Sequence, residues 1–589
     1  MKKTLILLFI FLFPITSVIA AQVRTQKVTV PLTFDSYYSY DMVVDAVKAL
    51  NKAYPHLTKL DIVGKSEEER AIYCMTVNNP KTGKELDKPG VYMDANIHGN
   101  ELQATEVTLY FLNYILTKYG KNKEVTKLVD KNCIYVIPIV NVDGRYHFFA
   151  DANTPDSNRG LRRPHDDDFD GLYDEDFPDD LDGDGNICTM RKRDPFGQLK
   201  TDPEDSRLMV RVKPGEKGEW TLLGQEGIDN DGDGKINEDS EGYVDGNRNW
   251  GFDWMPPYVQ AGAGDYPFSG TGIKAIAAYV RKRPNICIAW ALHNSGGMYL
   301  RGPSSKGLGE YPPQDIAVYD YIGKQAERIT PGYQYMVSWK DLYTTYGDFL
   351  EWMVGCNGAY GYVIELFQSS TETFKSREEE KRAKPGTEEG GNPFMENNDV
   401  ARERLKFSDH LVQGELYKPW KAYKHPTYGD IEIGGWVKFS SRLSAPFMLK
   451  DLVHRNAMAM LFSAKHTPEV ELDVFDLKKI DKGLYRVRTR LLNKKAIPTM
   501  SYFSQKTNLY PKDMLKVSGK NAKVIAGGTL NDIYRDQVTY KQHRPELQFL
   551  FVPGFGKVEH QFLVEGKGEI TLKYSSRFGG KITKTVELK

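Results

Sequence analysis

The feature that most constrains this chain is an alternation of short apolar runs with helical patterns between Thr25 and Lys465. Runs such as IYCMTV, VYMDANI, ICIAWAL and YGYVIELF have the length of strands, and residues 40–54 and 107–116 carry apolar side chains at helical spacing. Strands that alternate with helices form layered folds built on a parallel sheet. We therefore predict an α/β fold with a mixed, mostly parallel sheet flanked by helices.

The pattern changes after Pro468. Segments such as GLYRVRTRLLN, VEHQFLVEG and GEITLKYSS alternate polar and apolar residues at a period of two, and no helical pattern separates them. This indicates a C-terminal all-β sandwich domain over residues 468–589. The segment carries no catalytic constellation, so packing, solubility and attachment to a glycan or a protein partner all stay open as its role.

The N-terminus has the form of an export signal. Two lysines precede the apolar run TLILLFIFLFPITSVIA, which ends in small residues suited to cleavage. We predict a signal peptide over residues 1–20, a mature chain that begins near Ala21, and a secreted or periplasmic protein of bacterial type. No Cys follows the apolar run to take a lipid, and no later stretch has the length needed to span a bilayer.

Charge and cysteine content limit the alternatives. The 589 residues include 79 basic and 79 acidic side chains, so the chain has no overall field that would favour nucleic acid. Cys133 and Cys287 lie inside apolar strand-like runs, and the total of five cysteines is odd. Buried free thiols are therefore expected, although an oxidising compartment leaves one disulfide open.

A polar tetrad, HGNE from His98 to Glu101, follows the run VYMDANI and precedes a helical pattern. Ligands of open parallel sheets gather at the carboxyl ends of strands. An imidazole and a carboxylate at this spacing supply two of the three protein ligands of a catalytic zinc. Taken alone, the tetrad is more simply explained as a surface histidine beside a glutamate that starts a helix.

Two further apolar runs end in residues of the same types. His293 closes IAWALH and Glu365 closes YGYVIE, and a carboxylate inside an apolar run is costly to bury unless it has a task. A hydrolytic zinc site needs a third ligand and a general base. His293 and Glu365 are the candidates for these two roles, because all of these residues end strands of one predicted sheet.

Six segments match those of a known family in the same order: HGNE at His98, NRGLRR at Asn158, VDGNRNW at Val244, LHNSGG at Leu292, LYTTYGDFLEW at Leu342, and VIEL with Glu365. They resemble the zinc carboxypeptidase family, the funnelins that include carboxypeptidases A and B. Tyr343 also precedes Glu365 at the family's spacing. The resemblance implies a zinc carboxypeptidase-like catalytic domain, which we place at residues 21–467.

The resemblance implies how the metal would be held. His98, Glu101 and His293 would bind one catalytic Zn²⁺. Glu365 would be the general base that activates water and then returns the proton to the leaving amine. Asp245 would orient His98 from behind, as carboxylates commonly do for metal-binding histidines.

The resemblance also implies how a peptide would be bound. Arg162 would polarise the scissile carbonyl and stabilise the oxyanion, with its neighbour Arg163 as the alternative. Asn247 and Arg248 would hold the terminal carboxylate of the substrate, because a planar guanidinium suits that group. Tyr343 would close over the bound end.

Two positions depart from the family's digestive members. Asn100 stands between the two ligands where those members have Arg, so contacts upstream of the scissile bond should differ. Leu350 occupies the position where members specific for basic residues carry Asp. We therefore expect Leu350 to shift the preference away from C-terminal Lys and Arg.

Residues 164–244 form an acidic insertion where compact relatives have a short loop, and it holds three repeats with Asp at the first, third and fifth positions before Gly. This spacing turns a loop around Ca²⁺, and Gly permits the sharp bend. The bidentate Glu of an EF-hand is missing, so we expect structural calcium in loops of another type. The candidate ligands are Asp229, Asp231, Asp233, Asn237 and Asp239, then Asp180, Asp182 and Asp184, then Asp166, Asp168 and Asp170.

These features predict a secreted zinc metallocarboxypeptidase that hydrolyses C-terminal peptide bonds by zinc-activated water with a Glu general base. Its partners would be the C-termini of peptides or proteins. Two alternatives stay open: an amidase or endopeptidase of the same fold that acts on cell-wall peptides, and a non-catalytic peptide-binding protein.

Overall fold

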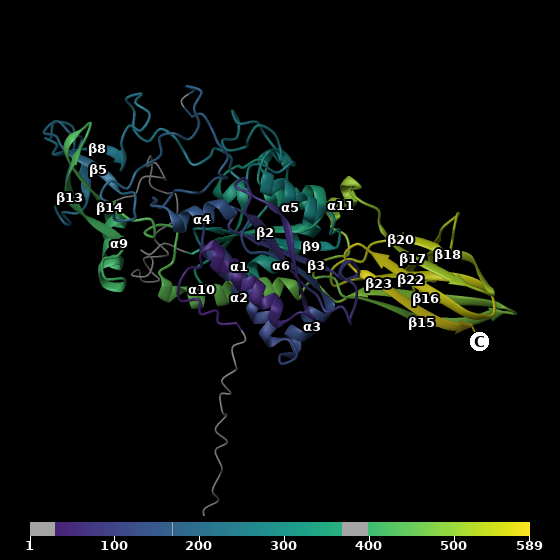
Figure 1. The fold of residues 1–589 in the computed structure, drawn as a ribbon. Coiled ribbons are helices and arrows are strands. Elements are labelled where there is room, and N and C mark those ends of the chain that lie inside the picture. The colour runs from purple at the N-terminus through teal and green to yellow at the C-terminus, as the bar shows by residue number, and fades with distance from the viewer. Residues whose placement is uncertain (1–29, 168, 368–397, 589) are drawn as a thin grey trace, which may run out of the picture.

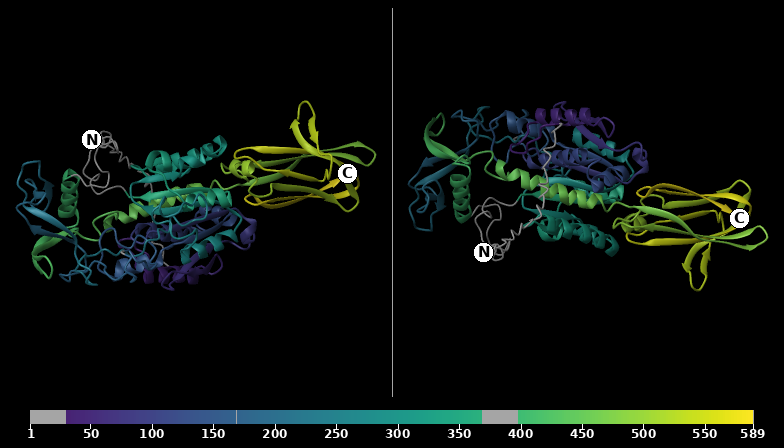
Figure 2. Two further views of the ribbon diagram at one scale, coloured as in Figure 1. Left: turned by 90° about the horizontal axis from the view of Figure 1, so that it is seen from above. Right: turned by 90° about the horizontal axis from the view of Figure 1, so that it is seen from below.

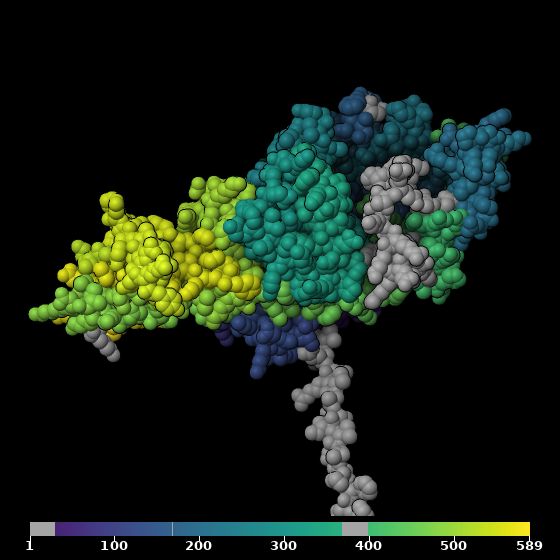
Figure 3. All heavy atoms as spheres, turned by 180° about the vertical axis from the view of Figure 1, so that it is seen from behind, coloured from purple at the N-terminus to yellow at the C-terminus, as the bar shows by residue number. Residues whose placement is uncertain are grey.

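A computed structural model describes residues 30–167, 169–367 and 398–588 (Figure 1). The α/β part of the chain occupies the middle of the molecule, with a small sheet at one end and two long sheets at the other. The same arrangement is visible from above and below in Figure 2 and from behind in Figure 3. The predicted signal peptide and Asp168 lie outside the described residues.

The central sheet has eight strands in the order β1-β2-β4-β3-β9-β12-β10-β11. Its strands are β1 Thr58–Lys65, β2 Ala71–Val77, β4 Cys133–Ile137, β3 Gly90–Ala95, β9 Ile286–Asn294, β12 Tyr360–Leu366, β10 Met298–Arg301 and β11 Gln334–Val337. The middle strands β4, β3, β9 and β12 are parallel, whereas β1, β2 and β10 join antiparallel neighbours. The predicted mixed α/β sheet is confirmed.

Helices cover this sheet. The helix α10 Leu449–Ala464 packs against α2 Gln103–Lys118 and α6 Pro313–Ile329, and α7 Phe349–Asn357 packs against β12 and β9. The remaining helices of this region are α1 Tyr40–Ala53, α3 Lys123–Lys131, α4 Val142–Ala150 and α5 Thr271–Arg281. Each of β3, β4 and β9 is buried along its whole length, which explains why these strands are continuous apolar runs.

A second sheet, which the sequence did not predict, is built from two distant segments. Its order is β13-β14-β5-β8-β6-β7, with β13 Tyr417–His425, β14 Gly429–Trp436, β5 Thr189–Arg193, β8 Trp220–Gln225, β6 Leu199–Thr201 and β7 Met209–Arg211. The acidic insertion therefore pairs with strands that follow α9 Asn398–Leu411. The Arg191 guanidinium lies 3.7 Å from the Trp220 ring and 3.9 Å from the Trp420 ring, and it joins the two segments.

The C-terminal region is rich in antiparallel strands, as predicted. Its first sheet has the order β15-β16-β21-β18-β19 and its second β20-β17-β22-β23. The strands are β15 Val470–Asp481, β16 Leu484–Asn493, β17 Asp513–Gly519, β18 Ala522–Asp532, β19 Gln537–Tyr540, β20 Leu547–Leu550, β21 Lys557–Gly566, β22 Gly568–Ser576 and β23 Gly580–Leu588, with the short helix α11 Tyr502–Thr507 between β16 and β17. The two sheets enclose their own apolar core, which includes Val487, Leu515 and Phe562.

This region rests against the α/β part through polar contacts. Asp315, at the start of α6, accepts hydrogen bonds from the backbone N–H groups of Tyr502 and Phe503. The Arg577 side chain donates to the carbonyl oxygens of Pro284 and Asn357. All five cysteines are free thiols, and Cys356 alone among them is exposed. No helix among the described residues is long and apolar enough to cross a bilayer.

Candidate metal and active site

The tetrad HGNE lies on a tight loop at the carboxyl end of β3. Asn96 adopts a left-handed backbone conformation (φ 59°), and its side-chain amide donates to the carbonyl oxygens of His98 at 2.6 Å and Gly99 at 3.1 Å. A Cβ atom on Gly99 would come within 2.3 Å of the Asn158 carbonyl oxygen. The loop therefore requires Gly at this position and fixes both neighbouring side chains.

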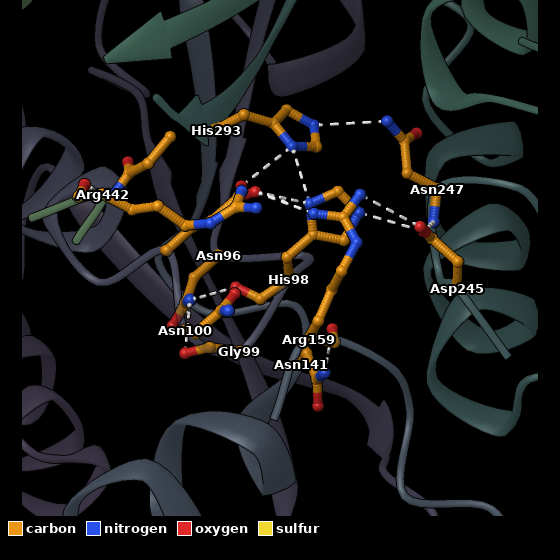
Figure 4. A network of polar contacts seen from close by, with 12 residues as sticks. Asn96, His98, Gly99, Asn100, Asn141, Arg159, Asp245, Asn247, His293 and Arg442 are labelled. Carbon is orange, nitrogen blue, oxygen red and sulfur yellow. Dashed lines mark hydrogen bonds and ion pairs between the residues drawn. The ribbon is translucent and has the colours of Figure 1, made fainter. Parts of the chain in front are cut away.

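The rings of His98 and His293 lie side by side at this edge of the sheet (Figure 4), and Glu101 contacts both of them. His98 Nδ1 is 2.8 Å from Glu101 Oε1, and His293 Nδ1 is 3.0 Å from Glu101 Oε2. The two Nδ1 atoms are 3.2 Å apart. All three residues are buried, and their ligand atoms could hold one metal ion. His98 and Glu101 come from the loop between β3 and α2, and His293 comes from β9, as expected for strands that end at one edge of a sheet.

Asp245 fixes the orientation of His98. Its Oδ1 atom is 2.9 Å from His98 Nε2 and also accepts from the Asn247 backbone N–H at 2.7 Å. Although burial opposes it, the neighbouring His98 and Arg159 hold the pKa of the Asp245 carboxyl well below its usual range. An ionised Asp245 keeps the proton of His98 on Nε2, so the Nδ1 lone pair faces Glu101 and His293.

Glu101 is also ionised. Burial opposes ionisation, but His98 and His293 hold the pKa of the Glu101 carboxyl below its usual range. Two imidazole nitrogens and a buried carboxylate make a nitrogen and oxygen donor set of the kind that zinc prefers.

Arg159, which the sequence reasoning did not select, contacts this cluster. Its guanidinium lies 3.4 Å from Glu101 Oε1 and 3.1 Å from Asp245 Oδ2. Arg162, the predicted oxyanion residue, instead contacts Asn158 at 3.1 Å and Glu68 at 3.3 Å. Arg163, the alternative, donates to the Ser269 carbonyl oxygen at 2.7 Å and pairs with Asp265.

Of the arginines in this segment, Arg159 therefore contacts the cluster, whereas Arg162 and Arg163 contact other residues. The segment NRGLRR contains three arginines, and the bend at Asn158, which has a left-handed conformation (φ 61°), sends the first of them towards the cluster. The resemblance of the segment indicated an arginine near the site, but the short local match could not say which one.

Glu365 lies beside the cluster on β12, in register with His293 on β9. Burial raises the pKa of the Glu365 carboxyl to about 7, and the nearby Glu101 charge acts in the same direction. A carboxyl that is poised near neutral pH can take a proton and give it back.

A pocket of about 140 Å³ opens on one side of the cluster. Its lining includes the predicted substrate-binding residues Asn247, Arg248, Tyr343 and Leu350. The Asn247 amide nitrogen is 3.4 Å from His293 Nε2, and its oxygen accepts from the Phe349 backbone N–H at 3.0 Å. Tyr343 is half exposed, at the end of a short π-helical turn (Ser338–Leu342). These residues can hold the end of a ligand.

Arg442 is a second residue that the sequence reasoning missed. It comes from the segment between β14 and α10, takes a left-handed conformation (φ 60°), and lines the same pocket. Its carbonyl oxygen accepts from the side chains of Gln103 and Asn294, both at 3.3 Å. No motif surrounds it in the sequence, so only the fold brings it to the site.

The acidic repeats of the insertion form several clusters. Asp229, Asp231 and Asp233 converge as predicted, and Asp231 is also close to Asp170 and Glu175. Asp229 Oδ1 accepts from the Gly232 N–H at 2.6 Å and its Oδ2 from the Gly234 N–H at 3.1 Å, which closes the loop.

The other predicted calcium ligands are placed differently. Asp239 caps the backbone N–H groups of Glu175 and Asp176, and the Asn237 amide donates to the Gln225 carbonyl oxygen. Asp184 pairs with Lys418 at 2.9 Å instead of joining Asp180 and Asp182. Asp166 accepts from the N–H groups of Asp170 and Gly171. These residues therefore shape the loops, and within the described part of the chain none of the four belongs to a group of acidic residues that could hold a cation.

Other acidic residues complete two clusters. Glu226 joins Asp180 and Asp182, and the pair Asp176 and Glu238 joins Asp231. Burial raises the pKa of the Glu226 carboxyl to about 7, and burial together with Asp176 and Asp233 raises that of Glu238 to about 7. Both Glu238 carboxylate oxygens are buried with no hydrogen-bond partner among the described residues.

The comparison with known proteins agrees with this geometry. Residues 43–206 match a family model described as zinc carboxypeptidase, and residues 469–587 match one described as a domain of unknown function. Carboxypeptidase D of Homo sapiens is 36% identical over 109 residues, which are 18% of this chain and 8% of that protein. Carboxypeptidase B of Homo sapiens is 27% identical over 128 residues, or 22% of this chain and 30% of that protein.

The buried cluster of two histidines and a glutamate at the strand ends of an α/β sheet could hold a metal ion. The family match places residues 43–206 in the zinc carboxypeptidase family. The chain spans less than a third of the length of these two curated relatives. The crystal structure of carboxypeptidase A from Helicoverpa armigera aligns over 76% of this chain and 79% of that one, with 16% identity and a TM-score of 0.41.

Proposed function

We propose that this protein is a zinc metallocarboxypeptidase that removes the C-terminal residue of peptides and is exported by a signal peptide over residues 1–20. The supporting observation is the buried cluster of His98, Glu101 and His293 beside Glu365. We assign catalysis to residues 21–467 and regard residues 468–589 as a separate β domain.

The residues fit zinc. The Nδ1 atoms of His98 and His293 and the carboxylate of Glu101 lie within 3.2 Å of one another. Protons shared among these atoms do not satisfy all of their lone pairs. His98, Glu101 and His293 would hold the ion, and Asp245 would keep His98 in the tautomer that binds it. When bound, zinc supplies a Lewis acid that polarises a carbonyl and lowers the pKa of water.

The chain's own residues divide the remaining work. Glu365 accepts the proton of the attacking water and returns it to the leaving amine, which its pKa of about 7 allows near neutral pH. Arg159 is placed to stabilise negative charge that develops on the carbonyl oxygen. Asn247 and Arg248 hold the terminal carboxylate in the 140 Å³ pocket, and Tyr343 covers it.

Structural calcium is the second part of the proposal. The clusters at Asp229, Asp180 and Glu238 gather carboxylates that repel one another unless a cation lies between them. The orphaned oxygens of Glu238 support this assignment, because buried carboxylates are normally paired. Since the insertion connects Arg159 to Asn247, calcium would hold these two substrate-binding elements in place.

The experiment combines metal analysis with mass spectrometry of peptides that vary in their C-terminal residue. The wild-type protein should retain about one zinc and shorten peptides one residue at a time from the C-terminus. Glu365→Gln should keep the zinc and lose at least about 100-fold in rate, the usual contribution of a general base. Intact peptides in the presence of bound zinc would defeat the exopeptidase assignment.

A further inference from the structure

A large groove adjoins the zinc pocket. Its cavity volume is about 1380 Å³, against 140 Å³ for the zinc pocket itself. We name it the upstream groove, and its walls include Tyr37, Phe149, Val400, Trp436, Phe439 and Arg442. Most of the lining lies between Val400 and Pro446, in α9, the loop after it, β13, β14 and the segment between β14 and α10, so the groove depends on a part of the chain that forms the second sheet.

The upstream groove is continuous with the zinc pocket. Ser295 and Arg442 line both cavities, and Ser295 is two residues after His293. A ligand that leaves the zinc pocket on this side therefore passes the Arg442 side chain.

Arg442 is held in position but keeps donors for a ligand. Its carbonyl oxygen is fixed by the side chains of Gln103 and Asn294. Its guanidinium pairs through Nε with Asp156 at 3.1 Å, and Asp156 is 72% exposed. Among the described residues the guanidinium makes no other hydrogen bond to this chain, and it is about one third exposed.

The arrangement of side chains around the two histidines gives the direction of a bound peptide. In Figure 4, Asn247 and Asp245 lie on one side of the His98 and His293 rings and Arg442 lies on the other. If the terminal carboxylate lies at Asn247 and Arg248, the rest of the peptide must leave past Arg442. It then enters the upstream groove.

Buried polar atoms at the boundary of the two cavities have no partner in the chain. The hydroxyls of Ser440 and Ser444 and the Oδ1 atom of Asn294 have none among the described residues, and Ser444 and Asn294 are only 2% exposed. Orphaned buried polar atoms are rare in folded proteins. Ser440 and Ser444 line the groove and Asn294 lines the zinc pocket, so the boundary between the two cavities is polar.

We propose that the upstream groove binds the polypeptide chain on the amino side of the scissile bond, with Arg442 donating to a backbone carbonyl and aromatic walls contacting apolar side chains. The inference rests on the proposed carboxypeptidase function. It assigns the substrate class as extended polypeptides with apolar residues before the C-terminus. The groove exceeds the roughly 300–1,000 Å³ of sites for small molecules, which fits several residues of extended chain.

The test uses N-acetylated peptides of about two to about eight residues, with one C-terminal residue and apolar residues before it, since each extended residue adds about 3.3 Å. For the zinc-loaded wild type, kcat/KM should rise at least about tenfold with length and then level off. Val400→Asp should remove most of this rise and leave cleavage of the shortest peptide unchanged within about twofold. Equal kcat/KM for all lengths would overturn the proposal.

Leu411→Asp is the matched control. Leu411 lies on the same helix as Val400 and is 40% exposed against 36%, but it does not line the groove. For the Leu411→Asp variant, kcat/KM should depend on peptide length as it does for the wild type. Arg442→Gln should lower kcat/KM for the longest peptide at least about tenfold more than for the shortest, because it removes a charged hydrogen bond to the chain.

Binding separates the two proposals. In calorimetry, the zinc-loaded Glu365→Gln protein should bind the same peptides with an affinity that increases with peptide length. Adding Val400→Asp should abolish this increase. If no peptide is cleaved by the wild type but affinity still rises with length, the carboxypeptidase function fails and the groove assignment holds. If peptides are cleaved and neither affinity nor rate depends on length, the groove assignment fails alone.

Discussion

The Asp245 carboxylate accepts a hydrogen bond from His98 Nε2 at 2.9 Å and holds the His98 ring with its Nδ1 atom towards Glu101 and His293. The two residues are far apart in the sequence. The loop that carries Asp245 therefore decides the tautomer of His98, which lies on the loop after β3. This contact fixes the donor set before any metal binds.

Replacing Asp245 should weaken metal binding more than it weakens the fold. Asp245→Asn removes the charge that keeps the proton on His98 Nε2, and loss of such a partner typically costs about 10–100-fold in metal affinity. Competition with a zinc-binding dye measures the affinity. Asp265→Asn, at an exposed carboxylate that pairs with Arg163, is the control and should bind zinc as the wild type does. Equal affinity in both variants would contradict the role of Asp245.

Arg159 and Arg162 should differ sharply in a matched pair of substitutions. Arg159→Gln should lower kcat by about 100-fold or more, since loss of one oxyanion donor costs about 10²–10³. Arg162→Gln should stay within a few-fold, because Arg162 contacts Asn158 and Glu68 away from the cluster. Steady-state kinetics on one peptide decides the matter. A larger loss for Arg162→Gln would restore the assignment made from the sequence.

Calcium should stabilise the insertion. We expect calcium to raise the Tm by several degrees, because an ion that binds only the folded state adds about 2.7 kcal/mol at a hundred times its Kd. Glu238→Gln should reduce this increase. Glu216→Gln, in the same insertion but paired with Lys200 on the surface, should not. EGTA should reverse the increase in Tm while metal analysis shows that zinc is retained. An unchanged Tm on addition of calcium would refute the assignment.

Glu351 should make stability depend on pH. Burial and the neighbouring Asp348 and Asp253 raise the pKa of the Glu351 carboxyl to about 8, from its ordinary value of 4.5. The folded state therefore holds a proton that the unfolded state releases, and stability should fall as pH rises from about 4.5 to about 8.

Glu351→Gln should remove that fall. Its amide oxygen can still accept from the Tyr311 hydroxyl and the Ser304 N–H, which Glu351 Oε1 accepts from at 2.7 and 2.9 Å. Urea denaturation at pH 4.5 and pH 8 should show equal stability of variant and wild type at the lower pH and a more stable variant at the higher. The same difference in the free energy of unfolding between variant and wild type at both pH values would rule out titration of Glu351 as its cause.

Much of the fold follows from the sequence. The strands β3, β9 and β12 are continuous apolar runs because both of their faces are buried, and this made them recognisable without any structure. The change to a period of two after Pro468 likewise marked the antiparallel sheets. The second sheet was not recognised, since its strands β6 and β7 have only three residues each and its two segments are separated in the sequence by β9 to β12 of the central sheet.

The sequence by itself determined that His98, Glu101, His293 and Glu365 would end neighbouring strands, because parallel strands bring their carboxyl ends to one edge. Only the tertiary structure decided that Arg159 faces the cluster while Arg162 does not, and that Arg442 reaches it from a distant segment. Strand ends are fixed by a repeating backbone geometry that apolar periodicity reveals. The direction of a loop side chain depends on contacts with residues far away in the chain, such as Asp245 and Glu68, and no local pattern encodes these.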